Sequence, residues 1–250
     1  MKDFCVGKYI IRLMNKNDIE EVRLVQKLRY DYLLKDYNPL LTSDGYDDDG
    51  YDEYADSILV INSENNDICG VYRVATLETN PINKFMMESE FDLTPLKEKK
   101  ESFMELSRAV VNPKYRDGIT IQLLFLGIYH YATEHNCKYI LGLCSFHGTD
   151  PSIYKAGMAY VQKNYSFEKY QLKAVMNPFR LDIVETENID KAIIREQTPG
   201  LLRMYLNLGC KIGCGGSIDM EFKSLDVLIV FDIDEVNKRY LDRLIKMENN

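Results

Sequence analysis

Three short polar motifs lie close together in the chain, with apolar stretches between them. Glu105 and Arg108 stand on a first apolar stretch, Arg116 and Gly118 precede an amphipathic segment, and residues 145–150 follow a second apolar stretch. A buried strand, a turn, a helix and another buried strand in this order predict a βαβ unit. A helix N-terminus that carries arginine and glycine offers N–H groups and positive charge to a phosphate. The pattern therefore predicts binding of a phosphate-bearing thioester, and hence acyl transfer.

Glu105 is the candidate general base. A primary amine arrives protonated and must lose a proton before it attacks a thioester, and a carboxylate in an enclosed site can take that proton. The three-residue spacing puts Glu105 and Arg108 on opposite faces of a strand unless a bulge intervenes. Proton removal through an ordered water is an equally good interpretation. No activated serine or cysteine stands out, which indicates direct attack without a covalent acyl-enzyme.

Charge and cysteine content exclude several classes of protein. The 250 residues carry a formal net charge of -8, which argues against general nucleic-acid binding because that needs a basic footprint. The six cysteines lack the spacing of a secreted disulfide framework, and no signal peptide or membrane-spanning segment is recognisable. The expected setting is the cytoplasm, with a peripheral contact at the inner face of the membrane left open.

Hydrophobic periodicity predicts the elements that position these motifs. We expect strands at 8–13, 57–62, 68–77, 103–111, 137–144, 217–222 and 227–232, and helices at 18–36, 118–135, after 150–151, at 189–208 and at the C-terminus. Residues 42–56 are expected to be an acidic loop too polar for the core, and 81–100 a short helix with a charged linker. This order predicts a mixed sheet with helices on both faces.

Four segments carry a combination of residues that is specific when taken together. They are Leu28-Arg29-Tyr30, then Asp49-Gly50-Tyr51-Asp52 with Gly70-Val71-Tyr72-Arg73, then Glu105-Leu106-Ser107-Arg108 with Pro113-Lys114-Tyr115-Arg116, and Pro199 to Gly209 with Asp219, Phe222 and Asp226. In this combination the chain resembles the acyl-carrier-protein-dependent N-acyltransferases of the GNAT superfamily, in the hemolysin-like group that contains the ornithine lipid synthases. It resembles the acyl-homoserine-lactone synthases more distantly.

The resemblance implies a single GNAT-like α/β (α+β) domain over 1–250, with a partly splayed mixed sheet. Its expected parts are an N-terminal flap and hairpin (1–100), an acyl-donor βαβ unit (101–150), a helical insertion (151–215), and closing strands with a final helix (216–250). The thioester is expected to lie in a gap between the two parallel strands of the βαβ unit.

Two departures from the family pattern concern the acceptor. Ser57 stands where relatives carry histidine, and Asn207 stands where arginine is usual, so the acceptor can differ from ornithine. The glycine-rich phosphate loop of ordinary GNAT enzymes is also degraded over residues 116–121. Coenzyme A presents a pyrophosphate that needs several backbone N–H groups, whereas a carrier protein's pantetheine arm has a single phosphodiester. The weak loop therefore favours a carrier-protein donor.

The resemblance also implies a polar set beneath the flap, and these residues are the candidate catalytic group: Arg29, Asp49, Asp52, Arg73, Glu105 and Arg108. Three arginines and three acids can neutralise one another, because buried charge persists only when it is paired. A structural ion-pair network and a direct catalytic role are about equally favoured, and the same pairs can serve both.

The candidate acyl-donor residues follow the first strand of the βαβ unit. Backbone N–H groups of Val110, Val111 and Asn112 are expected to meet the oxyanion, by analogy with the fold. Arg116, beside Gly118, is the expected phosphate contact, and its alternative is an exposed loop arginine.

Two further residues are secondary candidates. His147 is a possible proton relay, and Asp150 is better explained as a helix cap. A Ser145–His147–Asp150 triad is discounted because hydrolase triads draw their members from separate loops. No zinc site is expected at Cys210 and Cys214.

With the resemblance, these observations predict an enzyme that moves a long-chain acyl group, with or without a 3-hydroxyl, from acyl carrier protein to the α-amine of an amino acid, and the resemblance implies ornithine as the first acceptor. No permanently bound cofactor is expected. The expected co-substrate is the 4'-phosphopantetheine thioester of the carrier protein or acyl-CoA. The open alternatives are N-acyl glycine or another N-acyl amino acid, an acyl-homoserine-lactone-type signal, and a non-catalytic acyl-binding relative.

Overall fold

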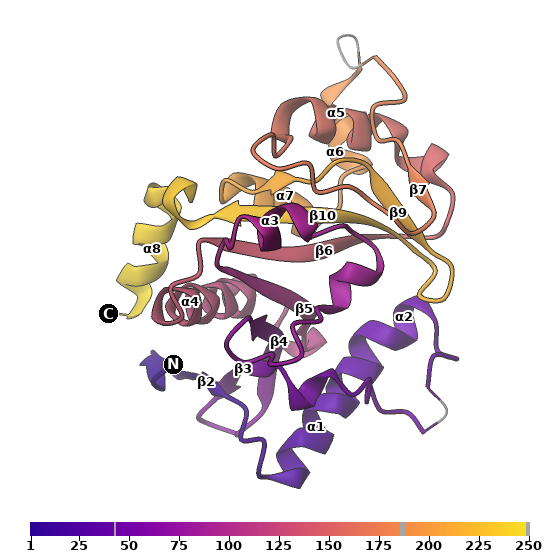
Figure 1. Cartoon of the computed structure of the whole chain (residues 1–250). Coiled ribbons are helices and arrows are strands. Elements are labelled where there is room, and N and C mark those ends of the chain that lie inside the picture. The colour runs from indigo at the N-terminus through magenta and orange to yellow at the C-terminus, as the bar shows by residue number, and fades with distance from the viewer. Residues whose placement is uncertain (43, 186–188, 249–250) are drawn as a thin grey trace. The chain divides into compact units, whose positions relative to one another are not determined.

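The computed structural model describes residues 1–42, 44–185 and 189–248 (Figure 1). It divides into two compact units. Unit 1 contains Met1–Lys84, Phe103–Cys137 and the C-terminal segment from Lys238, and unit 2 contains Phe85–Ser102 and Lys138–Asn237. Each unit has its own strands and helices. The expected division of one domain into four parts stays a prediction.

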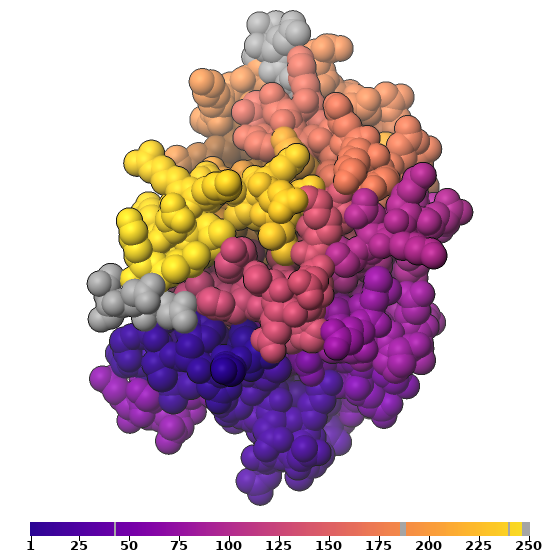
Figure 2. Space-filling model, turned by 60° about the vertical axis from the view of Figure 1, so that its left-hand side comes forward, coloured from indigo at the N-terminus to yellow at the C-terminus, as the bar shows by residue number. Residues whose placement is uncertain are grey.

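Among the described residues of unit 1, five strands pair in chain order, each antiparallel to the next. Those strands are β1 (Phe4–Val6), β2 (Tyr9–Leu13), β3 (Asp56–Asn62), β4 (Ile68–Thr76) and β5 (Phe103–Val111). Side chains along β3 and β4 are buried almost throughout, as in strands covered on both faces. Four of these strands were predicted, whereas the three residues of β1 are too few to form a recognisable pattern. The N-terminal segment that contains β1 is indigo in Figure 2 and reaches the surface there.

One face of this sheet is covered by α1 (Ile19–Arg29). The helix begins after Asp18, which caps it: the carboxylate accepts hydrogen bonds from the N–H groups of Glu20 and Glu21. Its apolar stripe, which includes Val25 and Leu28, packs into a core with side chains of β3, β4 and β5. This packing fixes the helix over the strands that carry the candidate catalytic residues.

The predicted first helix is interrupted after α1. A π-helical turn over Tyr30–Leu34 follows, and α2 (Lys35–Tyr37) ends the helical segment before Pro39. A π-type turn holds one extra residue and frequently occurs at functional sites. Arg29, a candidate site residue, is the last residue of α1 and directly precedes this turn.

The opposite face of the sheet is covered by α4 (Ile119–Glu134), which was predicted almost to the residue. Gly127 permits a close approach, because a Cβ atom at this position would lie 2.8 Å from Cγ2 of Ile58. The C-terminal helix α8 (Lys238–Glu248) contacts α4 and β1. No helix in the described part of the chain combines the length and the apolar character needed to cross a membrane.

Unit 2 is built on two long antiparallel strands, β6 (Tyr139–His147) and β10 (Ser224–Asp232). Shorter strands extend the sheet: β9 (Gly216–Asp219) and β8 (Lys211–Ile212) pair with β10, and β7 (Pro178–Phe179) pairs with β9. Its helices are α3 (Thr94–Glu98), α5 (Lys155–Tyr165), α6 (Lys191–Glu196) and α7 (Gly200–Asn207).

Two predictions for unit 2 were wrong. The segment expected to be a charged linker packs in the core, because Phe85, Phe91, Leu93 and Leu96 are buried between its charged residues. The single helix expected over 189–208 is two helices, since Pro199 between them has no N–H to donate and disfavours helical geometry in the residue before it.

Candidate active site

The acidic loop before β3 is not simply a solvated loop, which corrects the prediction that it is too polar for the core. Asp47 is only 1% exposed. Its backbone N–H donates to the carbonyl oxygen of Gln26 (3.2 Å), and its own carbonyl oxygen accepts a hydrogen bond from Nη2 of Arg29 (2.7 Å). Both partners belong to α1, so the loop is fixed to this helix by its backbone as well as by its charges.

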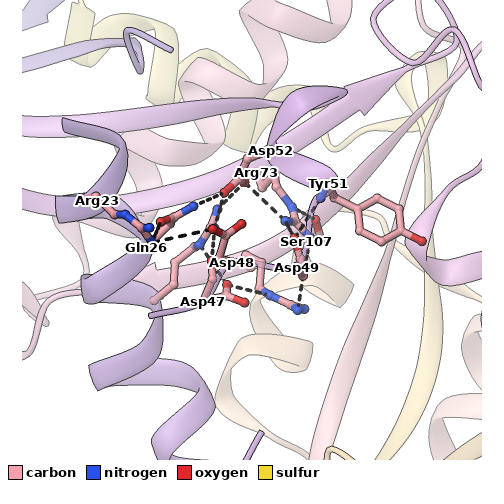
Figure 3. Close-up of polar contacts among 11 residues, drawn as sticks. Arg23, Gln26, Asp47, Asp48, Asp49, Tyr51, Asp52, Arg73 and Ser107 are labelled. Carbon is pink, nitrogen blue, oxygen red and sulfur yellow. Dashed lines mark hydrogen bonds and ion pairs between the residues drawn. The ribbon is translucent and has the colours of Figure 1, made fainter. Parts of the chain in front are cut away.

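Three aspartates of this loop and three arginines form a closed cycle of ion pairs, which we call the charge ring: Arg29, Asp47, Arg108, Asp49, Arg73 and Asp52. Each aspartate bridges two arginines, and each arginine bridges two aspartates. Figure 3 labels the three aspartates and Arg73. The ring contains equal numbers of positive and negative groups. Since its members come from α1, the loop, β4 and β5, the ring holds four segments of unit 1 together.

The contacts within the ring are short and mostly charge-assisted hydrogen bonds. Asp47 Oδ2 lies 2.9 Å from Nε of Arg29 and 2.9 Å from Nε of Arg108. The guanidinium of Arg73 forms a bidentate pair with Asp49, at 2.6 and 2.8 Å. Arg29 and Arg73 are 0% and 1% exposed, so their pairing is required, because an unpaired buried charge is very costly.

The ring lowers the pKa of two of its carboxylates, Asp49 and Asp52. Burial by itself raises the pKa of Asp49, but the hydrogen bonds and charge of Arg73, with the charge of Arg108, hold that pKa well below its usual range. The pKa of Asp52 is lowered in the same way, against burial, mainly by Arg29. The same surroundings raise the pKa of Arg73, where Asp49 outweighs desolvation. At neutral pH these aspartates are therefore anions that position arginines, and they are poor general bases.

A β-bulge lies in β5 at the first of the predicted catalytic motifs. Arg73 pairs with Ser107 and Val71 pairs with Val110, so β5 contains one more residue than β4 between these two pairs. Arg108 lies in the bulge with φ 55°, a left-handed conformation that costs a non-glycine residue about 1–2 kcal/mol. The two aspartates that bind its guanidinium hold the residue in this conformation.

The bulge resolves the difficulty raised by the spacing of Glu105 and Arg108. Glu105 and Ser107 are two residues apart, so they share a face of β5, and Nε of Arg73 donates to Oγ of Ser107 (3.0 Å) on that face. Arg108 stands in the bulge itself, and from its left-handed backbone its guanidinium reaches Asp47 and Asp49 of the charge ring. Glu105 is 3% exposed and lies on the same strand face as the ring.

The sequence interpretation missed three residues of the site. Asp47 was passed over although it begins the run of three aspartates that includes Asp49, and this run was the available signal. Gln26, 4% exposed, donates to Oδ2 of Asp52 (3.3 Å), and Ser107 accepts from Arg73. Neither residue type indicates such a role by itself, because polar side chains on a helix or strand normally face solvent.

The proposed oxyanion donors are not all available. The N–H of Asn112 donates to the carbonyl oxygen of Cys69 (2.8 Å), so this residue is a poor oxyanion donor, which corrects its assignment. Val110 and Val111 lie on β5 beyond the bulge, and their role stays a prediction. The expected gap beside β5 also stays a prediction, because β5 belongs to unit 1 and β6 to unit 2.

The turn before α4 has the exposed arginine and the glycine expected of a phosphate site. Gly118 has φ 87°, a left-handed conformation that glycine adopts readily, and Nε of Arg116 donates to the carbonyl oxygen of Val111 (3.2 Å). Asp117 lies between them, and its carboxylate accepts from the N–H of Ile119 (2.9 Å). This carboxylate occupies one N–H of the helix terminus, so fewer donors remain for a ligand.

The two secondary candidates lie at the end of β6 and do not form a triad. Ser145 donates its hydroxyl to Asp226. The carboxylate of Asp150 accepts from the N–H of Ser152 (2.9 Å), which confirms its role as a cap, and hydrogen bonds from the side chain and the backbone of Ser152 lower the pKa of Asp150. His147 is exposed and pairs in register with Ser224. A relay role for His147 stays a prediction.

Comparison with known proteins gives the relationships of this chain. Residues 28–126 match the acetyltransferase (GNAT) domain. The chain is 26% identical over 242 residues to a Rhodobacter capsulatus protein named L-ornithine N(alpha)-acyltransferase, with 93% of each chain covered. A protein of the same name from Brucella abortus is 27% identical, with 94% of this chain and 88% of the relative covered.

Solved structures share the fold at low sequence identity. The N-acyl amino acid synthase FeeM, from uncultured soil microbes, has a TM-score of 0.54 at 9% identity, covering 91% of this chain and 93% of that chain. The CoA-dependent acyl-homoserine lactone synthase BjaI has a TM-score of 0.56 at 14% identity, covering 96% of this chain and 90% of that chain. The predicted fold and the predicted relationship are both confirmed. The chain therefore has the GNAT fold, matches the acetyltransferase (GNAT) domain over residues 28–126, and is similar along most of its length to proteins named L-ornithine N(alpha)-acyltransferase.

Proposed function

We propose that this protein is an N-acyltransferase that moves a long-chain acyl group from a 4'-phosphopantetheine thioester to the α-amine of an amino acid, with ornithine as the first acceptor to test. The observation that carries the proposal is the bulge in β5, which gives Glu105 and Arg108 one strand face beside the charge ring. Similarity to ornithine acyltransferases along nearly the whole chain supports the reaction class.

In the proposed mechanism, Glu105 takes a proton from the acceptor's ammonium group, directly or through a water. The amine nitrogen then bonds to the thioester carbonyl carbon, and the C–S bond breaks. The sulfur leaves as the thiol of the pantetheine arm, and one proton is released overall at neutral pH. The charge ring holds the loop and Arg108 in place, so that the acceptor meets a rigid polar surface that needs little reorganisation.

Acyl carrier protein is the proposed donor in preference to acyl-CoA. Arg116 and the first turn of α4 would bind the donor phosphate, while Asp117 already occupies the N–H of Ile119. A site with few donors suits the single phosphodiester of a carrier protein better than a pyrophosphate. The expected product is amphipathic, so we include a peripheral membrane contact in the proposal.

The proposal is tested by incubating the purified protein with a panel of amino acids and an acyl donor. The donor is acyl carrier protein loaded with a long-chain 3-hydroxyacyl group in one series and acyl-CoA in the other. Mass spectrometry is expected to detect an N-acyl amino acid and the free thiol of the donor in equal amounts, at a higher rate with the carrier protein. The absence of an amide with every donor and acceptor would reject the acyltransferase assignment. Methylthioadenosine formed from S-adenosylmethionine would instead identify an acyl-homoserine-lactone synthase.

A further inference from the structure

A second group of polar side chains lies buried in unit 2, outside the site already described. Asp226 of β10 pairs in register with Ser145 of β6 and with Ser217 of β9, so the three side chains share one face of the sheet. The carboxylate of Asp226 is 3% exposed and accepts hydroxyl hydrogen bonds from Ser145 and from Ser224 (2.6 Å). Both oxygens of this carboxylate therefore have donors.

Glu90 completes this group from the segment that precedes α3. Its backbone carbonyl oxygen accepts from the N–H of Val175 (2.7 Å), which fixes its position. The side chain is 6% exposed, and its Oε2 atom is buried without a hydrogen-bond partner among the described residues. The hydroxyl of neighbouring Ser217 lies 2.9 Å from the carbonyl oxygen of Met176, and its interaction with the Glu90 carboxyl only partly opposes the effect of burial on the pKa of Glu90. Glu90 thus presents an unsatisfied carboxyl oxygen inside the protein, which is rare and costly.

The electrostatics of this group are unbalanced. Neither Glu90 nor Asp226 has an ion-pair partner in the described part of the chain, and Asp219 adds further negative charge. Burial, followed by the charge of Asp226, raises the pKa of Glu90 to about 8, and burial raises the pKa of Asp226 to about 6. Two carboxyl groups held near each other without a cation retain a proton that a cationic ligand would displace.

A primary ammonium group has the chemistry that these residues lack. It is compact, positively charged, and carries three donors and no acceptor, which suits carboxyl and hydroxyl oxygens. A metal ion is less suitable, because no group of three or more histidine, cysteine or acidic residues within the described ranges is arranged to hold one. The charge ring of unit 1 is not suited to bind an ammonium group, because each of its aspartates already bridges two arginines.

We propose that Glu90 and Asp226 form a binding site for the primary ammonium group of a small amine ligand. The inference goes beyond the proposed function, because this group lies within unit 2, whereas Glu105 and the charge ring belong to unit 1. Ornithine, lysine and 2,4-diaminobutyrate all qualify, and their neutral counterparts norvaline, norleucine and 2-aminobutyrate differ only by the side-chain amine.

Isothermal titration calorimetry of the whole protein with these three pairs of amino acids tests the site. At least one basic member is expected to bind ten- to a hundredfold more tightly than its neutral counterpart, the range of a charge-assisted hydrogen-bonded contact. Titration at pH 7 in two buffers of different ionisation enthalpy should reveal proton release that is absent with the neutral counterpart. This release is specific to a ligand that displaces the proton of Glu90, so a purely structural role for the pair would not produce it.

Two conservative substitutions and one matched control complete the test. Glu90→Gln and Asp226→Asn each remove a charge and retain nearly the same shape, and each should abolish the preference for the basic member. Glu98→Gln changes an exposed glutamate in α3 and should leave the preference intact. Equal binding of every pair by the wild type, or an unchanged preference in both substituted proteins, overturns the inference. Failure of the proposed function would differ, because no amide would form with any acceptor.

Discussion

Arg108 and Asp49 close the charge ring: Nη2 of Arg108 lies 2.9 Å from Oδ2 of Asp49, and Arg108 makes this contact from a left-handed bulge. The favourable ion pair and the unfavourable backbone conformation therefore occur at one residue. Bulges of this kind usually place glycine at the left-handed position. Arginine at this position indicates that the ion pairs of its guanidinium outweigh the strain of its left-handed backbone.

Substitution of Arg108 can separate these two effects. Arg108→Ala loses both ion pairs and keeps the strained backbone, whereas Arg108→Gly loses the ion pairs and relieves the strain. We expect Arg108→Gly to be about 1 kcal/mol more stable than Arg108→Ala in urea denaturation, with both variants inactive. A glycine variant no more stable than the alanine variant would show that the bulge is unstrained.

Arg29 tests how strongly the ring holds the loop. Its guanidinium is 0% exposed and binds Asp47 and Asp52, so Arg29→Met leaves two carboxylates with fewer partners. We expect a loss of about 3 kcal/mol in the free energy of unfolding of unit 1. Arg23→Ala, on the exposed side of the same helix, is the matched control and should cost less than about 1 kcal/mol. Similar losses in the two variants would contradict a structural role for the ring.

Much of unit 1 was predictable because its apolar patterns are regular. The strand over 103–111 was predicted with the bounds of β5, and α4 differs from its predicted range by one residue at each end. The sequence indicated only that a bulge would be needed to bring Glu105 and Arg108 to one strand face. It could not place the bulge at Arg108, because arginine gives no signal for a left-handed conformation. The role of Asp47 was not predictable for another reason. A carboxylate in an acidic loop is expected to be solvated, and the partners of Asp47 in α1 and β5 are 18 or more positions away in the sequence.

Unit 2 was less predictable because its segments are short and their pairing is distant in sequence. Glu90 lies among charged residues that resemble a linker, yet its neighbours are buried and its backbone bonds to residues 175 and 176. Strands of two residues, such as β7 and β8, give no periodic signal.

The buried Glu90 predicts an unusual dependence of stability on pH. Its pKa is raised in the folded protein to about 8, so the folded state binds more protons than the unfolded state above the ordinary glutamate pKa. Proton binding at Glu90 therefore contributes fully to the stability of the folded protein below about pH 4.5. This contribution is lost as the pH rises to about 8. Glu90→Gln should remove this loss and be more stable than the wild type at pH 8, measured by thermal unfolding at both ends of this range. Parallel pH profiles for the two proteins would contradict the prediction.

Arg116 tests the donor site independently of the chemistry. If its guanidinium contacts the donor phosphate, Arg116→Ala should raise KM for the acyl donor about tenfold and leave kcat nearly unchanged. Lys2→Ala serves as the control, because it removes an exposed charge that is distant from Arg116 in the sequence. A fall in kcat with unchanged KM would place Arg116 in a different role.

The most direct test of the account is single-turnover amide formation by Glu105→Gln, with Glu98→Gln as the control and urea denaturation to verify folding. The account predicts that the control matches the wild type, while Glu105→Gln is at least about a hundredfold slower at pH 7. It also predicts partial recovery toward pH 9, where the α-amine loses its proton without assistance. A Glu105→Gln protein that folds and forms amide at the wild-type rate would contradict the claim that this face of β5 performs the reaction.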